Sequence, residues 1–327
     1  MIEIKETNNY LDIREQWEKL CENNEDISYY QSIEAMDLLW ENLKPYRFIH
    51  RINPRFFLFY KNNEIIMILP VFKRWLSKEC VGYGYKAGFG YIGAVYIDNI
   101  GNDLLLECFS LLRSIKNIRI TINRVKAETS LGMCLKEYGG EVSEEGYTVI
   151  DMPDNYNDYY NSLSKHMKQN LRTAYNRLKT DKCEYTFECI PYSQMKSEQS
   201  KELEKLYIDR QIYKYKKSKL YSFFVRNIDL ETKMQKSKNV DIRAFVLRIN
   251  GMVSAYFDGI YNNGEVIVPR LAIADGFNRY SPGVILLNES IKHLIENKID
   301  SIDLTHGQEN YKISMGGKVH QCIECKI

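Results

Sequence analysis

The stretch that decides the fold is Arg270-Leu271-Ala272-Ile273-Ala274-Asp275-Gly276-Phe277-Asn278-Arg279-Tyr280-Ser281-Pro282-Gly283-Val284. It predicts a strand, a tight loop and the start of a helix, because apolar residues continue at helical spacing, at Val284, Leu287, Ile291, Leu294 and Ile295. Ser281 suits an N-cap and Pro282 suits the first helical turn, so the N–H groups from Gly283 onward should point outward at the positive end of the helix. Glycine at 283 lets a phosphate oxygen approach the main chain. The stretch therefore predicts a pyrophosphate site, with a plain Ser-Pro helix start as the alternative.

Three strands are predicted just before and within this stretch, over Arg243–Ile249, Met252–Ile260 and Glu265–Ala274. The separators are Asn250-Gly251 and Asn262-Asn263-Gly264, which favour the positive φ angles of tight hairpin turns. We therefore expect an antiparallel meander that leads into the decisive loop.

The rest of the chain alternates between helical and strand patterns. Predicted helices cover Tyr10–Cys21, Ile33–Leu43, Leu104–Ile115, Asn161–Lys179 and Glu202–Tyr215, and predicted strands cover Arg55–Tyr60, Glu64–Phe72, Ile118–Val125, Tyr147–Asp151 and Ser301–Leu304. The glycine-rich stretch 82–90 lacks the strand-then-helix order of a dinucleotide fingerprint. A chain of 327 residues, 44% of them hydrophobic, is long enough for two cores, and we expect two domains, 1–152 and 153–327.

Composition excludes several classes of protein. With 45 basic and 43 acidic residues the net charge is +2, which argues against a dedicated nucleic-acid surface. No apolar run approaches the roughly 20 residues of a membrane span, and Met1-Ile2-Glu3-Ile4-Lys5 lacks a signal-peptide pattern, so we expect a cytoplasmic protein. Of eight cysteines only Cys322 and Cys325 have ligand spacing, which predicts reduced thiols and no metal site.

The predicted helix Asn161–Lys179 is amphipathic and basic. Its polar side carries Lys165, Lys168 and Arg172. These residues can form a cradle for the diphosphate of a substrate at a cleft between the halves, or simply a solvated charged face. Both interpretations stay open at this point.

The decisive loop also resembles a known family. The signature of the GNAT superfamily is Gln/Arg-x-x-Gly-x-Gly/Ala, and Asn278-Arg279-Tyr280-Ser281-Pro282-Gly283 resembles it at the same spacing, with Asn278 and Ser281 as departures. The wider chain is similar to the FemAB-like or CelD-like branch. The matching motifs are Tyr280-Ser281-Pro282-Gly283, Asp303-Leu304-Thr305-His306-Gly307, Tyr311-Lys312, the basic segment Ser164–Arg172 and Tyr29-Tyr30-Gln31-Ser32.

This resemblance implies an α+β protein with tandem GNAT-like domains, whose mixed and mostly antiparallel sheets are flanked by helices. The first half would be degenerate and the second would bind acyl-CoA. The implied activity is N-acyl transfer from CoA to a small amine acceptor, with a nucleotide-linked amino sugar of surface-polysaccharide biosynthesis as the expected acceptor. Two alternatives stay open: an aminoacyl-tRNA-dependent peptidoglycan-bridge ligase of the same fold, and a non-catalytic RNA-binding module.

Site residues follow from the motifs and the chemistry of acyl transfer, which needs a neutral amine, a polarised carbonyl and a tolerated thiolate. The expected acyl-CoA contacts are Leu271, Ala272, Ile273, Asn278, Arg279, Tyr280, Ser281, Pro282, Gly283, Val284 and Lys312. His306 is the expected base because imidazole titrates near neutrality, and Asp303 can orient or replace it. Tyr311 is the expected acid for the departing thiolate. A loop histidine and a packing tyrosine without chemical roles are the alternatives.

Overall fold

The computed structural model describes residues 1–22, 24–83, 91, 93–138, 141–218, 220–227 and 229–327. The chain forms two compact units, Met1–Gly146 with His320–Ile327, and Tyr147–Val319. Most of the glycine-rich stretch 82–90 lies outside the described residues. We expected the domain boundary after residue 152, just past strand β7 (Glu141–Asp151). The two compact units instead divide inside β7, between Gly146 and Tyr147, and His320–Ile327 belongs to the first unit. The domain boundary that we expected after residue 152 stays a prediction.

The first unit is built on a mostly antiparallel sheet. Its strand order is β1-β2-β3-β4-β6-β13, and β5 pairs with β3. Among the pairings between described residues of this unit, β4 with β6 is parallel and the others are antiparallel. The strands are β1 (Ile2–Thr7), β2 (Ile52–Lys61), β3 (Glu64–Arg74), β4 (Glu79–Gly82), β5 (Val95–Tyr96), β6 (Arg119–Lys126) and β13 (Lys318–Lys326), and the helices are α1 (Arg14–Cys21), α2 (Ile33–Glu41), α3 (Leu43–His50), α4 (Asn102–Ser114) and α5 (Ser130–Glu137).

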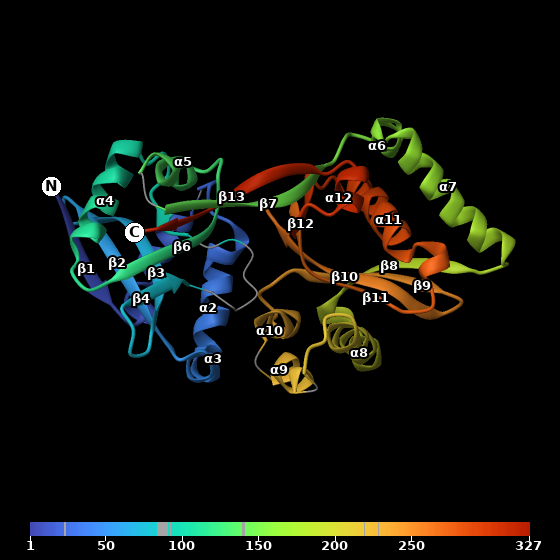
Figure 1. Cartoon of the computed structure of the whole chain (residues 1–327), viewed down its shortest axis with the longest axis horizontal. Coiled ribbons are helices and arrows are strands. Elements are labelled where there is room, and N and C mark those ends of the chain that lie inside the picture. The colour runs from blue at the N-terminus through green and yellow to red at the C-terminus, as the bar shows by residue number, and fades with distance from the viewer. Residues whose placement is uncertain (23, 84–90, 92, 139–140, 219, 228) are drawn as a thin grey trace. The chain divides into compact units, whose positions relative to one another are not determined.

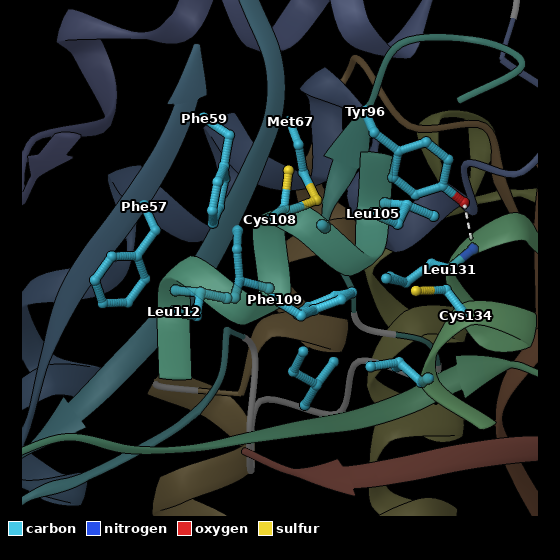
Figure 2. Packing of buried hydrophobic residues seen from close by; sticks show 14 of the residues in the cluster. Phe57, Phe59, Met67, Tyr96, Leu105, Cys108, Phe109, Leu112, Leu131 and Cys134 are labelled. Carbon is cyan, nitrogen blue, oxygen red and sulfur yellow. Dashed lines mark hydrogen bonds between the residues drawn. The ribbon is translucent and has the colours of Figure 1, made fainter. Parts of the chain in front are cut away.

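Apolar residues of the strands pack against α4 and α5 in this unit. Figure 2 shows Phe59 and Met67 of the sheet beside Leu105 and Cys108 of α4, all of them buried. The strands and α4 each bury one face in this packing. This is why the sequence shows alternating apolar residues in the strands and helical spacing of apolar residues in α4.

The second unit contains strands in the order β7-β12-β11-β10-β9-β8. Only β11 and β12 are parallel. The strands are β8 (Tyr185–Pro191), β9 (Ile242–Ile249), β10 (Met252–Asn262), β11 (Glu265–Ile273) and β12 (Ser301–His306), and the helices are α6 (Tyr156–Ser162), α7 (Lys165–Thr180), α8 (Ser197–Tyr213), α9 (Tyr221–Asn227), α10 (Leu230–Lys236), α11 (Pro282–Glu296) and α12 (Asn310–Ser314). Helices α7 and α11 cover one face of this sheet and α8 covers the other (Figure 1).

The predicted meander is confirmed, and the turns have the predicted geometry. Asn250 and Gly251 have φ angles of 50° and 79°, and Asn263 and Gly264 have φ angles of 44° and 79°. Two successive residues with positive φ match the right-handed twist of the strands that they join. These turns fix the register that carries β11 toward the decisive loop.

The helix predicted over Asn161–Lys179 is wrong at its start. The chain forms α6 and then α7, with an extended Leu163 between them, because the Ser164 hydroxyl accepts the N–H of Met167 and caps a new helix. The buried side of α7 is as predicted, at Met167, Leu171, Ala174 and Leu178. Elements that we did not predict include α3, α5, α9, α10, α12, β1, β4, β5, β8 and β13.

None of the helices in the described residues combines the length and the apolar composition that crossing a bilayer requires.

Candidate active site

The candidate site begins where two parallel strands separate. β11 and β12 pair only from Glu265 with Ser301 to Ile267 with Asp303. Beyond this point a cavity of about 610 Å³ opens. Its walls come from α8, β10, β11, α11, β12 and α12, and the lining residues are Arg210, Lys214, Tyr215, Phe257, Val268, Pro269, Arg270, Leu271, Ile273, Asn278, Ser281, Pro282, Gly283, Val284, Leu287, Leu304, Thr305, Glu309, Tyr311 and Lys312.

Two main-chain N–H groups of β11 face the edge that β12 leaves open. The N–H of Ala274 donates to the carbonyl of Ser254 at 2.9 Å, and Ala272 is opposite Tyr256 in the same register. Since residues of an antiparallel pair alternate between facing the partner and facing away, Leu271 and Ile273 point their N–H groups away from β10. Ala272 uses its main chain within the sheet and does not line the cavity.

The first turn of α11 forms another wall of the cavity. Ser281 is the N-cap, as predicted, but it has φ 51° and ψ 54° and its hydroxyl makes no capping hydrogen bond. Its carbonyl accepts the N–H groups of Val284 and Ile285 at 3.0 and 3.2 Å. Gly283, the second residue of the helix, belongs to the group of first-turn amides that have no acceptor within the helix.

Gly283 also has a packing reason to be glycine. A Cβ there would lie 2.8 Å from Cδ1 of Ile273, so the helix start and the strand end approach closely. The close packing of Ile273 and the predicted approach of a phosphate oxygen both require that residue 283 has no side chain.

Two residues of the decisive loop are turned toward α7 and the segment that follows it. The Nε of Arg279 donates to Oδ2 of Asp181 at 2.7 Å, and the hydroxyl of Tyr280 donates to the same oxygen at 3.0 Å. Neither Arg279 nor Tyr280 is among the residues that line the cavity. Their role as cofactor contacts stays a prediction, and their observed role is to fix the loop.

Lys312 lines the cavity, but its ammonium group is already engaged. It is only 4% exposed and donates to the carbonyls of Leu304 at 2.9 Å and His306 at 2.8 Å, with Glu309 Oε2 at 3.0 Å. These bonds hold the end of β12, where Thr305 has a φ of 57°, an unusual angle for a β-branched residue. Lys312 therefore supports the wall of the cavity, and its contact with phosphate stays a prediction.

The three expected catalytic residues are placed differently. Tyr311 lines the cavity, and burial, with the nearby carboxylate of Glu309 as a smaller cause, raises the pKa of Tyr311 to about 12. Asp303 is fully buried, and its Oδ1 accepts the N–H of Thr305 at 2.7 Å. His306 ends β12 opposite Tyr147 of β7. Neither Asp303 nor His306 lines the cavity, although Thr305 between them does.

The phosphate cradle that we expected at a cleft between the halves is not part of this cavity, and it stays a prediction. Lys165, Lys168 and Arg172 lie on the exposed side of α7, and none of them lines the cavity. The Nζ of Lys168 donates to the carbonyl of Asn161 at 2.8 Å.

Two cations that line the cavity, Arg210 and Lys214, are on α8 or directly after it, and we did not predict them. Their spacing of four residues places both on one side of the helix, which is the signal that sequence inspection could have used.

A buried charged cluster supports β11 from the other face. Arg270 is 2% exposed, and its Nε donates to Glu231 Oε2 at 3.1 Å. Its guanidinium also pairs with Asp229, and its Nε lies 4.0 Å from Oδ2 of Asp258. Its guanidinium stacks on Tyr207, with Cζ 4.2 Å from the ring centroid. Burial raises the pKa of Glu231 and of Asp258, and the neighbouring carboxylate of Asp229 adds to the rise, because one arginine cannot neutralise three carboxylates.

Comparisons with known proteins agree with this architecture. Residues 165–313 match the family described as Acetyltransferase (GNAT) domain. No curated protein matches the chain. Among solved structures, FemX is 9% identical over 98% of this chain and 96% of that chain, with a TM-score of 0.59. A tandem GNAT protein from the clavulanic acid biosynthesis pathway is 10% identical over 100% and 98%, with a TM-score of 0.52. L-PGS from Bacillus licheniformis is 14% identical over 93% of each chain, with a TM-score of 0.53.

At these identities the solved structures establish the fold alone. The α+β tandem GNAT fold that we expected is confirmed, and the segment that matches the GNAT acetyltransferase domain lies within the second unit, around the cavity.

Proposed function

We propose that this protein is an acyl-CoA-dependent N-acyltransferase that acts in the cytoplasm. The observation that supports it is one cavity bounded by two sets of main-chain donors, the N–H groups of Leu271 and Ile273 and the first turn of α11 at Gly283. A thioester carbonyl needs donors of the first kind, and a pyrophosphate needs the second. CoA carries both groups on one molecule.

In the proposed reaction the amine nitrogen of the acceptor attacks the thioester carbonyl, whose oxygen accepts the N–H of Leu271 as it gains charge. The C–S bond then breaks, and the hydroxyl of Tyr311 protonates the departing thiolate. That hydroxyl is protonated at neutral pH and can donate to the sulfur as negative charge develops there; because its pKa is raised to about 12, the tyrosinate left by proton transfer regains a proton from solvent at once. The expected base, His306, would take the amine proton through water beside Thr305, and Asp303 fixes the turn that carries it.

The acceptor that we propose is the amine of a nucleotide-linked amino sugar used in surface-polysaccharide biosynthesis. This part rests on the resemblance of the motifs to sugar N-acyltransferases and on the cations at the cavity. The described residues contain no group of three or more His, Cys, Asp or Glu side chains arranged to hold a metal ion.

The second candidate is an aminoacyl-tRNA-dependent ligase of the same fold. It is favoured by the region from the end of α8 to α9, where Tyr213, Leu220 and Phe223 are exposed near Lys214, Lys216 and Lys217. Exposed aromatic and basic side chains together suit nucleic acid.

A thiol-release assay separates the two candidates. The enzyme is supplied with acetyl-CoA or longer acyl-CoAs and a panel of nucleotide-linked amino sugars, and in parallel with aminoacyl-tRNA. Release of CoA that depends on an amine supports the first candidate. Transfer from aminoacyl-tRNA alone, with no CoA binding in calorimetry, overturns it.

A further inference from the structure

Arg210 and Lys214 are two cations that line the cavity without an acidic partner. Within the described ranges neither side chain has an ion pair, whereas the other charged lining residues, Arg270, Lys312 and Glu309, are all paired. Like charges four residues apart on a helix repel each other. Such a pair is stabilised when an anion binds between its members.

The position of Arg210 at the end of α8 does not fully explain why an arginine without an acidic partner lies at the cavity. A cation there interacts favourably with the helix dipole. However, Nη1 of Arg210 reaches across to β11 and donates to the carbonyl of Ile273 at 3.2 Å. This bond holds the guanidinium at the cavity and uses one of its five donors. The remaining donors are available to a ligand.

The cation pair and the proposed pyrophosphate site lie on opposite faces of β11. Helix α11, which begins beside Gly283, packs on the face that carries Leu271 and Ile273, whereas α8 packs on the face that carries Ala272. A donor whose phosphates lie at α11 therefore leaves the α8 side of the cavity to the second substrate.

We infer that Arg210 and Lys214 form an anion subsite for the acceptor, which is an amine that also carries a phosphate or carboxylate group. The inference rests on the proposed function and gives its acceptor a chemical class. Tyr215 and Tyr311 line the cavity beside the pair and provide aromatic surface for the body of the acceptor. In this arrangement the pair holds the anionic group while the amine reaches the β11 side of the cavity.

The test uses inorganic phosphate as the probe, titrated by calorimetry into protein saturated with CoA. The unchanged protein should bind phosphate, and the Arg210→Gln/Lys214→Gln variant should bind it at least about tenfold more weakly, as expected for lost charge-assisted contacts. Lys214→Gln alone keeps the bond from Arg210 to Ile273 and should already weaken phosphate binding. The matched control is Lys201→Gln/Lys205→Gln, which removes two charges at the same spacing from α8 and away from the cavity.

Three results would overturn the inference: no phosphate binding by the unchanged protein, equal binding by the double variant, or a loss of CoA affinity in the double variant, which would assign the pair to the phosphates of the donor. If CoA itself does not bind, the proposed function fails, and the same titration without CoA still tests the anion subsite. As a second readout, transfer from acetyl-CoA to glucosamine 6-phosphate should exceed transfer to glucosamine, and the double variant should lose that preference.

Discussion

The Nζ of Lys312 lies 2.8 Å from the carbonyl oxygen of His306 and donates a hydrogen bond to it. The same ammonium group bonds to Leu304 and Glu309, so one buried side chain holds the end of β12 against α12. The strained angle at Thr305 is found between these two carbonyls. Lys312 thus holds the end of β12, which carries the proposed base His306, against α12, which carries the proposed acid Tyr311.

Replacing this lysine should destabilise the protein. Lys312→Gln leaves buried carbonyls without their charged donor and should lower the free energy of unfolding by about 2–4 kcal/mol, measured by urea denaturation. Lys318→Gln is the matched control, because Lys318 is 71% exposed and pairs only with Asp151, and it should cost less than about 1 kcal/mol. Equal effects of the two substitutions would contradict the buried role of Lys312.

Adding a methyl group at Gly283 should weaken CoA binding more than it changes stability. Gly283→Ala gains helix propensity but meets Cδ1 of Ile273 at 2.8 Å, so the two effects on stability oppose each other. The methyl group also occupies the space beside the first-turn amide, and the Kd for CoA should rise about tenfold in calorimetry.

A second substitution separates packing from ligand contact at this position. Ile273→Val removes the clashing methyl group. If the glycine serves the phosphate, the double variant Gly283→Ala/Ile273→Val keeps the weak CoA binding. Recovery of normal affinity would show that packing alone requires the glycine. Gly101→Ala, where an added Cβ meets nothing within 4 Å, is the control.

Loss of the Tyr311 hydroxyl should slow turnover equally at every pH from 6 to about 10. Because the pKa of Tyr311 is raised to about 12, the hydroxyl stays protonated across this range. Tyr311→Phe should therefore lower kcat about tenfold without changing the shape of the pH profile. Tyr213→Phe, at an exposed position on α8, should leave kcat unchanged. A loss that appears only at high pH would mean that Tyr311 acts in its ionised form.

The cluster around Arg270 should make the protein less stable as the pH rises. Glu231 holds its proton in the folded state to about pH 8 but loses it near pH 4.5 in the unfolded chain. Between these values the folded state binds more protons, so the free energy of unfolding falls as pH increases. The new glutamine in the Glu231→Gln variant cannot ionise. Between pH 5 and 8 the free energy of unfolding of this variant should therefore fall by about 1–3 kcal/mol less than that of the wild type. Denaturation at a series of pH values measures this, with Glu198→Gln as an exposed control, and parallel curves for the wild type and Glu231→Gln would contradict the raised pKa.

Local signals in the sequence were sufficient for the meander and the decisive loop. Asn250-Gly251 and Asn263-Gly264 define tight turns by their own backbone preferences, and Ser281-Pro282 defines a helix start in the same way. The amphipathic pattern of α7 predicted its buried side correctly.

The missed features depend on partners that are distant along the chain. β13 pairs with β6 in the first unit, and the residues of β13 alone do not predict this pairing. We did not predict Arg210 and Lys214 as cavity residues, because two cations at helical spacing do not show which surface they face. We did not predict the left-handed angle at Thr305, which lies between the carbonyls of Leu304 and His306 that the ammonium group of Lys312 binds.

The most direct test of the central claim is a crystal structure of the protein with CoA bound. We predict that the pyrophosphate lies at the first turn of α11, with an oxygen within hydrogen-bonding distance of the N–H of Gly283, and that the thiol end points along β11 toward Leu271. CoA bound elsewhere on the protein, or a cavity that stays without CoA at saturating concentration, would contradict it.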